Sequence, residues 1–243
     1  MNNISKQYKH HYFYRYNSMT HQYFMTDKHI HSRWTDGTQT ILQIARYAKK
    51  MGLNQIAITD HIRKDSTYFN KYRREIKKVR SMVDLDILIG FEAKIENFNG
   101  DIDVSKKVIE QSQIKIGSVH RFPVGRKLYH AYEFPKKISQ EIEVELSVAA
   151  IKNSNINVLG HPGAMNLMAF KEFPEHCFET MIKECKINNV AFELNGHYHV
   201  TCKKYLIPLL RKYNVLVSLG SDAHTRNDFG ESHNELKRMC DHG

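Results

Sequence analysis

Residues 86–95 read DILIGFEAKI, an apolar run from Ile87 to Ala93 that is interrupted by one carboxylate, Glu92. A run this apolar is typical of a strand that is buried on both faces, as in a parallel sheet. Shorter runs of the same kind recur along the chain, and together with residues 86–95 they predict seven buried strands. The other six cover residues 23–28, 54–59, 114–119, 157–160, 190–195 and 215–220.

Amphipathic stretches separate these runs. Residues 38–51 follow a chain break at Asp36-Gly37 and space Ile41, Ile44 and Ala48 as one face of a helix. Further helices are expected over residues 68–83, 104–111, 138–152, 175–188, 202–212 and 230–240, with a Pro- and Gly-containing loop before the fourth helix of the chain. Strand–helix units that repeat at roughly 30-residue intervals indicate an α/β protein, either a barrel or a doubly wound sheet.

The composition excludes several classes of protein. The chain has 243 residues, of which 41% are hydrophobic, so it can bury a sizeable core and is not expected to be disordered. No apolar run approaches the ~18–20 residues of a membrane helix, so no membrane partner is expected. Its four cysteines are too widely spaced for a disulfide scaffold.

The chain shows no internal linker, so residues 24–243 are expected to form a single domain. Residues 1–23 are polar and aromatic and lack the apolar core of a secretory signal. We expect them to form a loose or partly docked N-terminal extension. Without an export signal or a disulfide pattern, the expected location is the cytoplasm.

Charge and histidine content indicate the kind of partner. The formal net charge is +10, which favours anionic partners such as phosphates or nucleic acid, although a solvated lysine-rich surface explains the same balance. Fifteen histidines is an unusual number for this length. Because histidine is costly to bury without a partner, this excess favours metal sites.

Residues of the metal-ligand type follow the predicted strands. In chain order they are His29, His31 and Asp36; Asp60 and His61; Glu92; His120; His161; the amide of Asn195; and Asp222 and His224. In a parallel barrel, all strand carboxyl ends lie at the face where active sites form. His29 and His31 are two residues apart on an extended segment, so their side chains point the same way. Six histidines and three or four carboxylates are too many for one ion and suit two or three.

The ordered motifs resemble those of the PHP (polymerase and histidinol phosphatase) superfamily. The resemblance is carried by HIHSRWTDG, TDH, the Glu of GFEAK, the His of GSVHRF, the His of GHPG, and GSDAH, and it runs from about Asp27 to Gly230. It implies that residues 24–243 form a distorted (β/α)7 TIM-like barrel. It also implies a trinuclear metal site that hydrolyses phosphoesters.

The resemblance also implies a ligand set, carried over position by position. The first metal site would consist of His29, His31, Glu92 and Asp222, with Glu92 bridging to the second. The second site would be completed by His120 and His161. The third would be formed by Asp36, His61 and His224. Some members of the superfamily have His at the position of Asp36. Asp60 is expected to orient a ligating histidine.

A phosphoesterase of this kind needs two or three divalent ions, and zinc, manganese and iron all accept this donor set. A hydroxide between two ions would be the nucleophile, because coordination lowers the pKa of water towards ~7. A cationic side chain should grip the phosphate oxygens. The candidates beside the ligands are Arg121, Arg63 and Lys94, of which Arg121, directly after His120, is favoured.

Several functions stay open at this stage. The favoured one is hydrolysis of a small phosphorylated metabolite, with a nucleotide and, by resemblance alone, histidinol phosphate as candidates. The alternative is a 3′–5′ exonuclease or nucleic-acid end-processing enzyme, for which the positive charge would suit a nucleic-acid partner. A non-catalytic metal-stabilised module and a metal-dependent amidohydrolase rank lower. Specificity is expected to depend on loops 122–132 and 196–201, and the oligomeric state stays open.

Overall fold

The computed structural model describes residues 12–125 and 127–240. Seven strands of the described chain run parallel, in the order β10-β9-β8-β5-β4-β3-β2. Their bounds are β2 Thr26–Asp27, β3 Gln55–Ile58, β4 Asp86–Lys94, β5 Ile114–Ser118, β8 Val158–Leu159, β9 Ala191–Asn195 and β10 Leu216–Gly220. Each of these strands falls within or overlaps a run that the sequence predicts as buried.

The sheet closes on itself between its first and last parallel strands. The backbone N–H of Lys28 donates to the carbonyl of Leu219 at 2.8 Å, and Asp222 N–H donates to the carbonyl of His29 at 2.9 Å. Ile30 and Ala223 form a parallel bridge just beyond. This closure confirms the distorted TIM-like barrel. The distortion is visible in β2 and β8, which have only two residues each.

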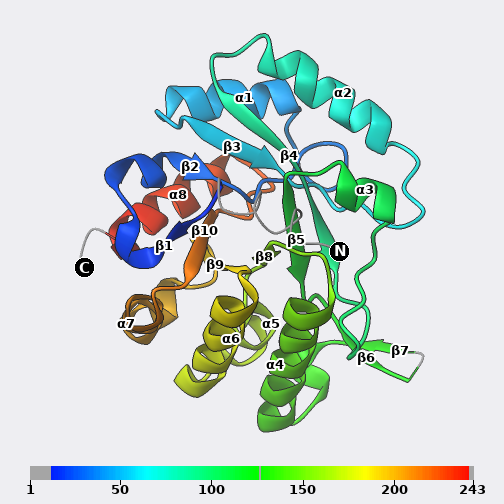
Figure 1. The fold of residues 1–243 in the computed structure, drawn as a ribbon, viewed down its shortest axis with the longest axis vertical. Coiled ribbons are helices and arrows are strands. Elements are labelled where there is room, and N and C mark those ends of the chain that lie inside the picture. Colours follow the sequence, from blue (N-terminus) through cyan, green and yellow to red (C-terminus); the bar gives the residue numbers. More distant parts are fainter. Residues whose placement is uncertain (1–11, 126, 241–243) are drawn as a thin grey trace, which may run out of the picture.

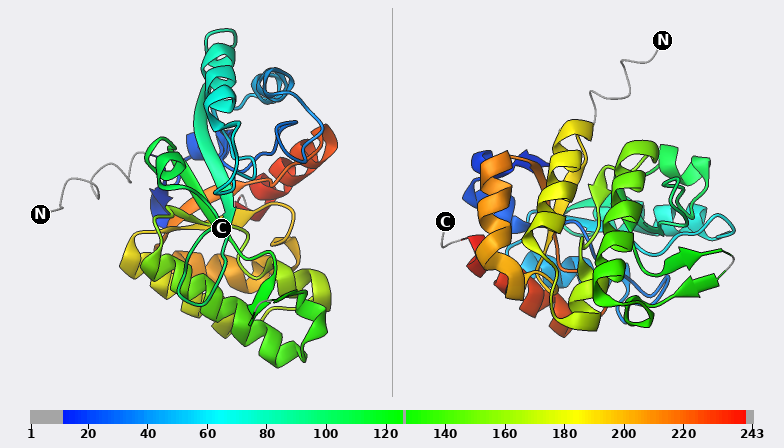
Figure 2. Two further views of the ribbon diagram at one scale, coloured as in Figure 1. Left: turned by 90° about the vertical axis from the view of Figure 1, so that its right-hand side faces the viewer. Right: turned by 90° about the horizontal axis from the view of Figure 1, so that it is seen from below.

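Helices surround the barrel (Figure 1). Their bounds are α1 Ile41–Lys50, α2 Phe69–Arg80, α3 Lys106–Glu110, α4 Lys136–Asn153, α5 Ala164–Phe170, α6 Glu175–Asn188, α7 Lys203–Tyr213 and α8 Arg226–Cys240. Figure 2 shows α4, α6 and α7 side by side along one side of the sheet. Helix α1 begins three residues after the predicted start at residue 38, because Thr40 caps it and Gln43 closes a reciprocal capping box. No helix in residues 12–125 and 127–240 has the length and apolarity to cross a bilayer.

Four local predictions differ from the structure. The predicted strand 23–28 is mostly a 3-10 helix, His21–Met25, followed by the short β2. Part of loop 122–132 forms an antiparallel hairpin, β6 Phe122–Val124 with β7 Lys127–Tyr129, which projects from the body in Figure 2. Helix α5 was not predicted. Helix α8 begins before Gly230, because Thr225 and Asp228 cap it reciprocally.

The N-terminal segment contributes to the barrel core. Strand β1, Tyr14–Arg15, pairs antiparallel with the first residues of β10, on the edge that β2 leaves free. The Phe13 side chain is buried in a cluster with alternate residues of six barrel strands: Ala57, Leu88, Ile114, Ile116, Val158, Ala191 and Leu216. Alternate residues of a strand share one face, and the intervening ones pack outward against the helices. Phe13 therefore fills the barrel interior below the metal-ligand candidates. Residues 1–11, the rest of the expected extension, lie outside the described residues.

Candidate metal centre

Glu92 lies at the centre of the barrel mouth with histidine rings around its carboxylate. Its Oε1 atom is 2.9 Å from Nε2 of His161 and 3.2 Å from Nε2 of His120. Its Oε2 atom is 3.0 Å from Nδ1 of His61, the residue that bridges to Glu92 across β3 and β4. The remaining two rings, His29 and His31, approach to 3.5 Å. Glu92 is almost fully buried, so its two oxygens can serve neighbouring ions.

The innermost group of donors combines His29, His31, Glu92 and Asp222, whose ligand atoms all lie within 4.8 Å of one another. Asp222 Oδ1 is 3.0 Å from His31 Nε2 and 3.3 Å from His29 Nε2. This is the set that the family resemblance implies for the first metal. The closure of the barrel between β2 and β10 forms this group, because it places Asp222, near the end of the chain, beside His29 and His31, near its start.

A second group lies nearer the solvent and combines His31, Asp36, His61 and His224. Asp36 Oδ2 is 3.2 Å from His61 Nε2 and 3.4 Å from His224 Nε2. Three of these residues form the third site that the resemblance implies. His31 belongs to both groups, so it lies between them.

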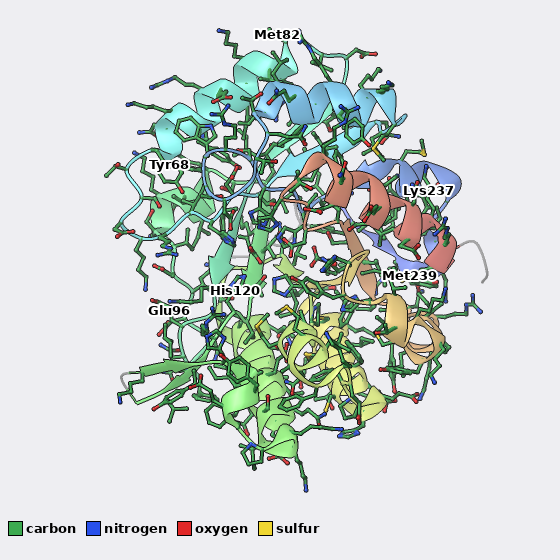
Figure 3. All side chains as sticks on the ribbon, turned by 180° about the vertical axis from the view of Figure 1, so that it is seen from behind. Tyr68, Met82, Glu96, His120, Lys237 and Met239 are labelled. Carbon is green, nitrogen blue, oxygen red and sulfur yellow. The ribbon has the colours of Figure 1, made fainter. Side chains whose placement is uncertain are left out.

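A third group combines His61, Glu92 and His120. His120 lies between the helices α1 and α2 on one side and α4 on the other (Figure 3). His161, which the resemblance implies as its partner, contacts Glu92 but is not within the close donor group. The structure thus brings all nine predicted ligands to one mouth, and their role as ligands stays a prediction.

Two of the predicted ligands have backbone conformations that side-chain-bearing residues rarely adopt. His161 has φ of 26° and Asp222 has φ of 54°. Positive φ places the backbone carbonyl close to Cβ and costs on the order of 1–3 kcal/mol, and such strain clusters at functional sites. With these backbone conformations, the His161 side chain reaches Glu92 and the Asp222 side chain reaches His29 and His31.

The donor set fits bound transition-metal ions. Several buried donor atoms make no aligned hydrogen bond within the described residues and contact only other imidazole or carboxylate groups: Nε2 of His29, Nδ1 and Nε2 of His31, and Oε2 of Glu92. An unpaired buried polar atom costs about 1–3 kcal/mol, so native proteins rarely leave several in one place. Imidazole and carboxylate are the donors that zinc, iron and manganese accept. The unpaired atoms therefore match sites for these ions.

Electrostatics support the same conclusion. Burial raises the pKa of Asp36, but hydrogen bonds from His224 and His61 outweigh burial and hold this pKa well below its usual range. Burial lowers the pKa of His61, but its contacts with Asp36 and Glu92 raise it to about 10. The carboxylates thus attract positive charge into the mouth. A divalent cation can replace the protons, because ligating histidines must be neutral.

Glu193 is a functional residue that sequence reasoning missed. It is fully buried, and its Oε1 atom lies 2.7 Å from Nδ1 of His29. The contact leaves Nε2 of His29 facing Glu92 and Asp222, as a partner that orients a metal ligand should. Gly220 makes room for the pair, since a Cβ there would lie 2.1 Å from Glu193 Oε1. The signal was an acidic residue within the apolar run 190–195, the same signal that Glu92 gives within its own run.

Asp60 does not orient a histidine, contrary to the prediction. Its carboxylate accepts hydrogen bonds from the backbone and hydroxyl of Ser32, at 2.8 and 2.7 Å, and from the hydroxyl of Thr35 at 2.8 Å. It therefore holds the loop that carries Asp36. Sequence position could not show this, because the hydrogen bonds of Asp60 reach Ser32 and Thr35 on a different segment of the chain.

The loop after β9 supplies a second unpredicted side chain. Asn195 Oδ1 accepts the backbone N–H groups of His197 and Tyr198, so this amide shapes the loop. The loop presents the Tyr198 ring to His161, with ring centroids 5.4 Å apart. Burial raises the pKa of Tyr198 far above its usual value, and the charges of Asp222 and Glu92 raise it further. Tyr198 is thus a neutral phenol beside the predicted ligands.

The three predicted cationic residues line one cavity with the ligands. Arg63, Lys94 and Arg121 border a cavity of about 440 Å³. The rest of its lining comprises Asp36, His61, Ile62, Glu92, Asp103, His120 and Leu128. Arg63 and Arg121 are exposed, and Lys94 is half-buried. Arg121 Nη1 donates to the carbonyl of His120 at 2.7 Å, so its guanidinium is at the rim of the mouth.

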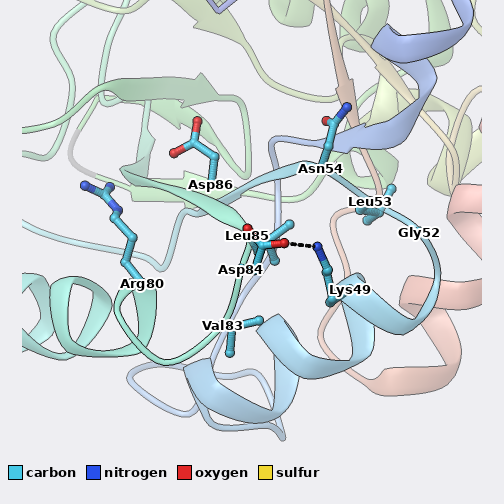
Figure 4. Close-up of a pocket in the computed structure, with 9 residues that line it drawn as sticks. All are labelled: Lys49, Gly52, Leu53, Asn54, Arg80, Val83, Asp84, Leu85 and Asp86. Atoms are coloured by element: carbon cyan, nitrogen blue, oxygen red, sulfur yellow. Dashed lines mark hydrogen bonds and ion pairs between the residues drawn. The ribbon is translucent and has the colours of Figure 1, made fainter.

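A different cavity, of about 500 Å³, lies at the opposite end of β3 and β4 (Figure 4). Its charged residues already have partners: Lys49 pairs with Asp84 at 2.7 Å, and Arg80 donates to the carbonyl of Ile87. It contains none of the predicted ligands. Active sites of parallel barrels form at the carboxyl ends of strands, so the chemistry belongs to the first cavity.

A parallel barrel with a polynuclear donor set at its carboxyl mouth defines a class of metal-dependent barrel proteins. The sequence profile of the PHP domain family matches residues 27–197. The chain therefore belongs to the PHP family, which confirms the resemblance in its motifs.

Relatives of the chain bear similar descriptions. It is 28% identical over 196 residues to a probable phosphatase of Caldicellulosiruptor saccharolyticus, covering 78% of this chain and 75% of the relative. It is 26% identical over 218 residues to a probable phosphatase of Photobacterium profundum, covering 85% and 81%.

Two solved structures share the fold. One is histidinol phosphate phosphatase of Lactococcus lactis in complex with zinc, L-histidinol and phosphate, with a TM-score of 0.69, 17% identity, and coverage of 89% of this chain and 92% of that one. The other is a putative histidinol phosphatase of Listeria monocytogenes, with a TM-score of 0.67, 17% identity, and coverage of 86% and 98%.

Proposed function

We propose that this PHP-family protein is a metal-dependent phosphoric ester hydrolase that removes phosphate from a small phosphorylated metabolite. The observation that carries the proposal is the group of buried imidazole and carboxylate atoms at the barrel mouth that converge on one another without aligned hydrogen bonds. These atoms open onto a cavity whose wall also holds Arg63, Lys94 and Arg121. The descriptions of the relatives as probable phosphatases support the same activity.

In this proposal, one group of residues binds the metal ions and another group binds the phosphate. His29, His31, Glu92 and Asp222 form the innermost ion site, and the outer donors serve one or two more ions. Glu193 keeps His29 in the orientation that this site needs. Zinc, manganese or iron held by these residues would supply a coordinated water of lowered pKa and would offset the charge on phosphate oxygens. Arg121 is placed at the rim to grip non-bridging phosphate oxygens, with Arg63 and Lys94 as further candidates.

The cationic residues of the cavity wall favour this function over a non-catalytic one. A non-catalytic metal-stabilised module would not need cationic residues around an open cavity, and the described residues that line this cavity include three. Exonuclease action stays an alternative, and histidinol phosphate and nucleotides are the first substrates to compare.

The test is phosphate release by protein loaded separately with zinc, manganese and iron. p-Nitrophenyl phosphate, histidinol phosphate, nucleoside monophosphates and a single-stranded oligonucleotide are the substrates. We expect release from at least one phosphomonoester, loss of release with a chelator, and recovery on reloading. Protein with full metal content that releases no phosphate from any phosphomonoester would contradict the proposal, and shortening of the oligonucleotide alone would favour the exonuclease.

A further inference from the structure

Arg63 and Lys94 line one cavity, and each follows by two residues a member of the bridged pair His61 and Glu92. His61 and Glu92 bridge in parallel register at the ends of β3 and β4. Arg63 and Lys94 each follow two residues later, and both line the same cavity. Since residues two apart on an extended segment share a face, both cations continue the inward-facing rows of His61 and Glu92.

These two cations lack the partners that nearby cations have. Lys64, next in the chain, pairs with Glu96, and its backbone N–H donates to Asp103. No hydrogen bond or ion pair joins the side chain of Arg63 or Lys94 to any residue in the described ranges 12–125 and 127–240. Among the described residues that line the cavity, Asp103 carries the one carboxylate that is not a predicted ligand. Like charges that line one cavity repel each other, so the unliganded arrangement is unfavourable.

The pair exceeds what one phosphate needs. A phosphate at the predicted metal sites would already face the bound ions and Arg121. The cavity wall then carries more positive charge than the carboxylate of Asp103 can offset, because it holds Arg63, Lys94 and Arg121. An anion beside Arg63 and Lys94 would relieve their mutual repulsion and gain charge-assisted hydrogen bonds.

We propose that Arg63 and Lys94 form a subsite for a second anionic group of the substrate, a carboxylate or a second phosphate. This inference rests on the proposed function and refines it. A phosphomonoester with a nearby ammonium group, such as histidinol phosphate, fits the subsite poorly, because the ammonium would meet two cations.

The first test compares four substrates that share one three-carbon chain and one scissile phosphate. They are propyl phosphate, 3-phosphooxypropionate, propane-1,3-diyl bisphosphate and 3-aminopropyl phosphate. We expect kcat/KM to be roughly 10- to 100-fold higher for the two substrates with a second anion than for propyl phosphate, and lowest for the amine. The carboxylate and bisphosphate arms show which anion the subsite prefers.

Variants test whether the preference for a second anionic group depends on Arg63 and Lys94. Arg63→Met and Lys94→Met should each reduce the ratio of kcat/KM between the substrates with a second anion and propyl phosphate to near one, whatever their effect on propyl phosphate itself. Lys49→Met is the matched control, because Lys49 pairs with Asp84 at the opposite face of the barrel. Metal content is measured for each variant and should equal that of the wild type, since neither residue is a predicted ligand.

Binding supplies a readout without turnover. Calorimetry on the zinc-loaded protein compares 3-phosphonopropionate with propylphosphonate, neither of which is hydrolysed. We expect roughly 10- to 100-fold tighter binding of 3-phosphonopropionate, abolished in the double variant. If propyl phosphate is hydrolysed and the second anion gives no advantage in either assay, the subsite is refuted while the proposed phosphatase activity stands. If no phosphomonoester is hydrolysed, the proposed function itself fails.

Discussion

His29 and Glu193 form a fully buried pair, with 2.7 Å between Nδ1 of the imidazole and Oε1 of the carboxylate. The second oxygen of Glu193 accepts the backbone N–H of His161. One carboxylate thus positions two predicted ligands from different strands. It also selects which ring nitrogen of His29 faces the other donors.

Glu193→Gln should weaken metal binding, because an amide supplies no charge to hold the ring proton of His29 at Nδ1. Loss of such an outer partner typically lowers metal affinity about 10- to 100-fold. Competition with a chelator of known affinity measures the effect. Glu143→Gln is the control, since Glu143 is equally buried but bonds to Met165 and Asn166. Equal metal affinity in wild type and Glu193→Gln would show that the pair is only structural.

Glu92→Gln should abolish activity while leaving the fold largely intact. An amide cannot supply the charge with which Glu92 would hold two ions. Loss of a residue that only orients a ligand lowers activity by up to roughly 100-fold, so Glu92→Gln should lower turnover by at least that factor. Phosphate release, metal content and circular dichroism are measured together. Near-normal turnover at full metal content would mean that Glu92 does not bridge.

Arg121→Ala should lower kcat/KM roughly 10- to 1000-fold, as expected for loss of a charge-assisted bidentate contact worth a few kcal/mol in the transition state. Metal content should be unchanged. Arg121→Lys should recover only part of the lost kcat/KM, since the lysine ammonium cannot form the two parallel hydrogen bonds that a guanidinium forms. Activity within about twofold of wild type in the alanine variant would leave Arg121 as a surface residue.

Phe13→Ala should destabilise the barrel by about 3–5 kcal/mol, the usual range for removing a buried phenylalanine. The side chain is 3% exposed and lies against residues from six strands. Urea unfolding of the metal-free protein measures the change. Tyr14→Ala is the control, because Tyr14 is 49% exposed, and it should change the unfolding free energy much less.

His233→Leu should make the protein less sensitive to acid. Both ring nitrogens of His233 are buried without a partner in the described chain, and burial lowers its pKa to about 4, with Lys237 adding to the effect. Between about pH 6.5 and 4 the unfolded state binds a proton that the folded state does not. Wild type therefore loses stability as the pH falls through that window, by about 1.4 kcal/mol per pH unit from this group.

The leucine variant lacks this group, so its stability relative to wild type should rise by about 2 kcal/mol between pH 7.5 and pH 5. Urea unfolding at the two pH values measures the difference. A constant difference would show that His233 titrates normally in the folded protein.

Local patterns in the sequence were sufficient for the barrel strands and for most of the helices. Helix 175–188 begins and ends where its pattern predicts, because burial periodicity and the flanking Pro174 and Asn189 act locally. The hairpin in loop 122–132 was missed, because its antiparallel register depends on packing of Phe122 and Tyr129 against Phe134.

The sequence by itself determined which residues reach the mouth of the barrel, because strand ends and the two-residue period of extended chain follow from local pattern. Only the tertiary structure decided how those residues group. Ring closure between β2 and β10 sets Asp222 against His29 and His31, and the bridge between His61 and Glu92 leads Arg63 and Lys94 into the wall of one cavity. The tertiary structure also decided that Asp60 bonds to the loop at Ser32 and Thr35 and that Glu193 contacts His29. These contacts depend on distances across the barrel, which no spacing along the chain encodes.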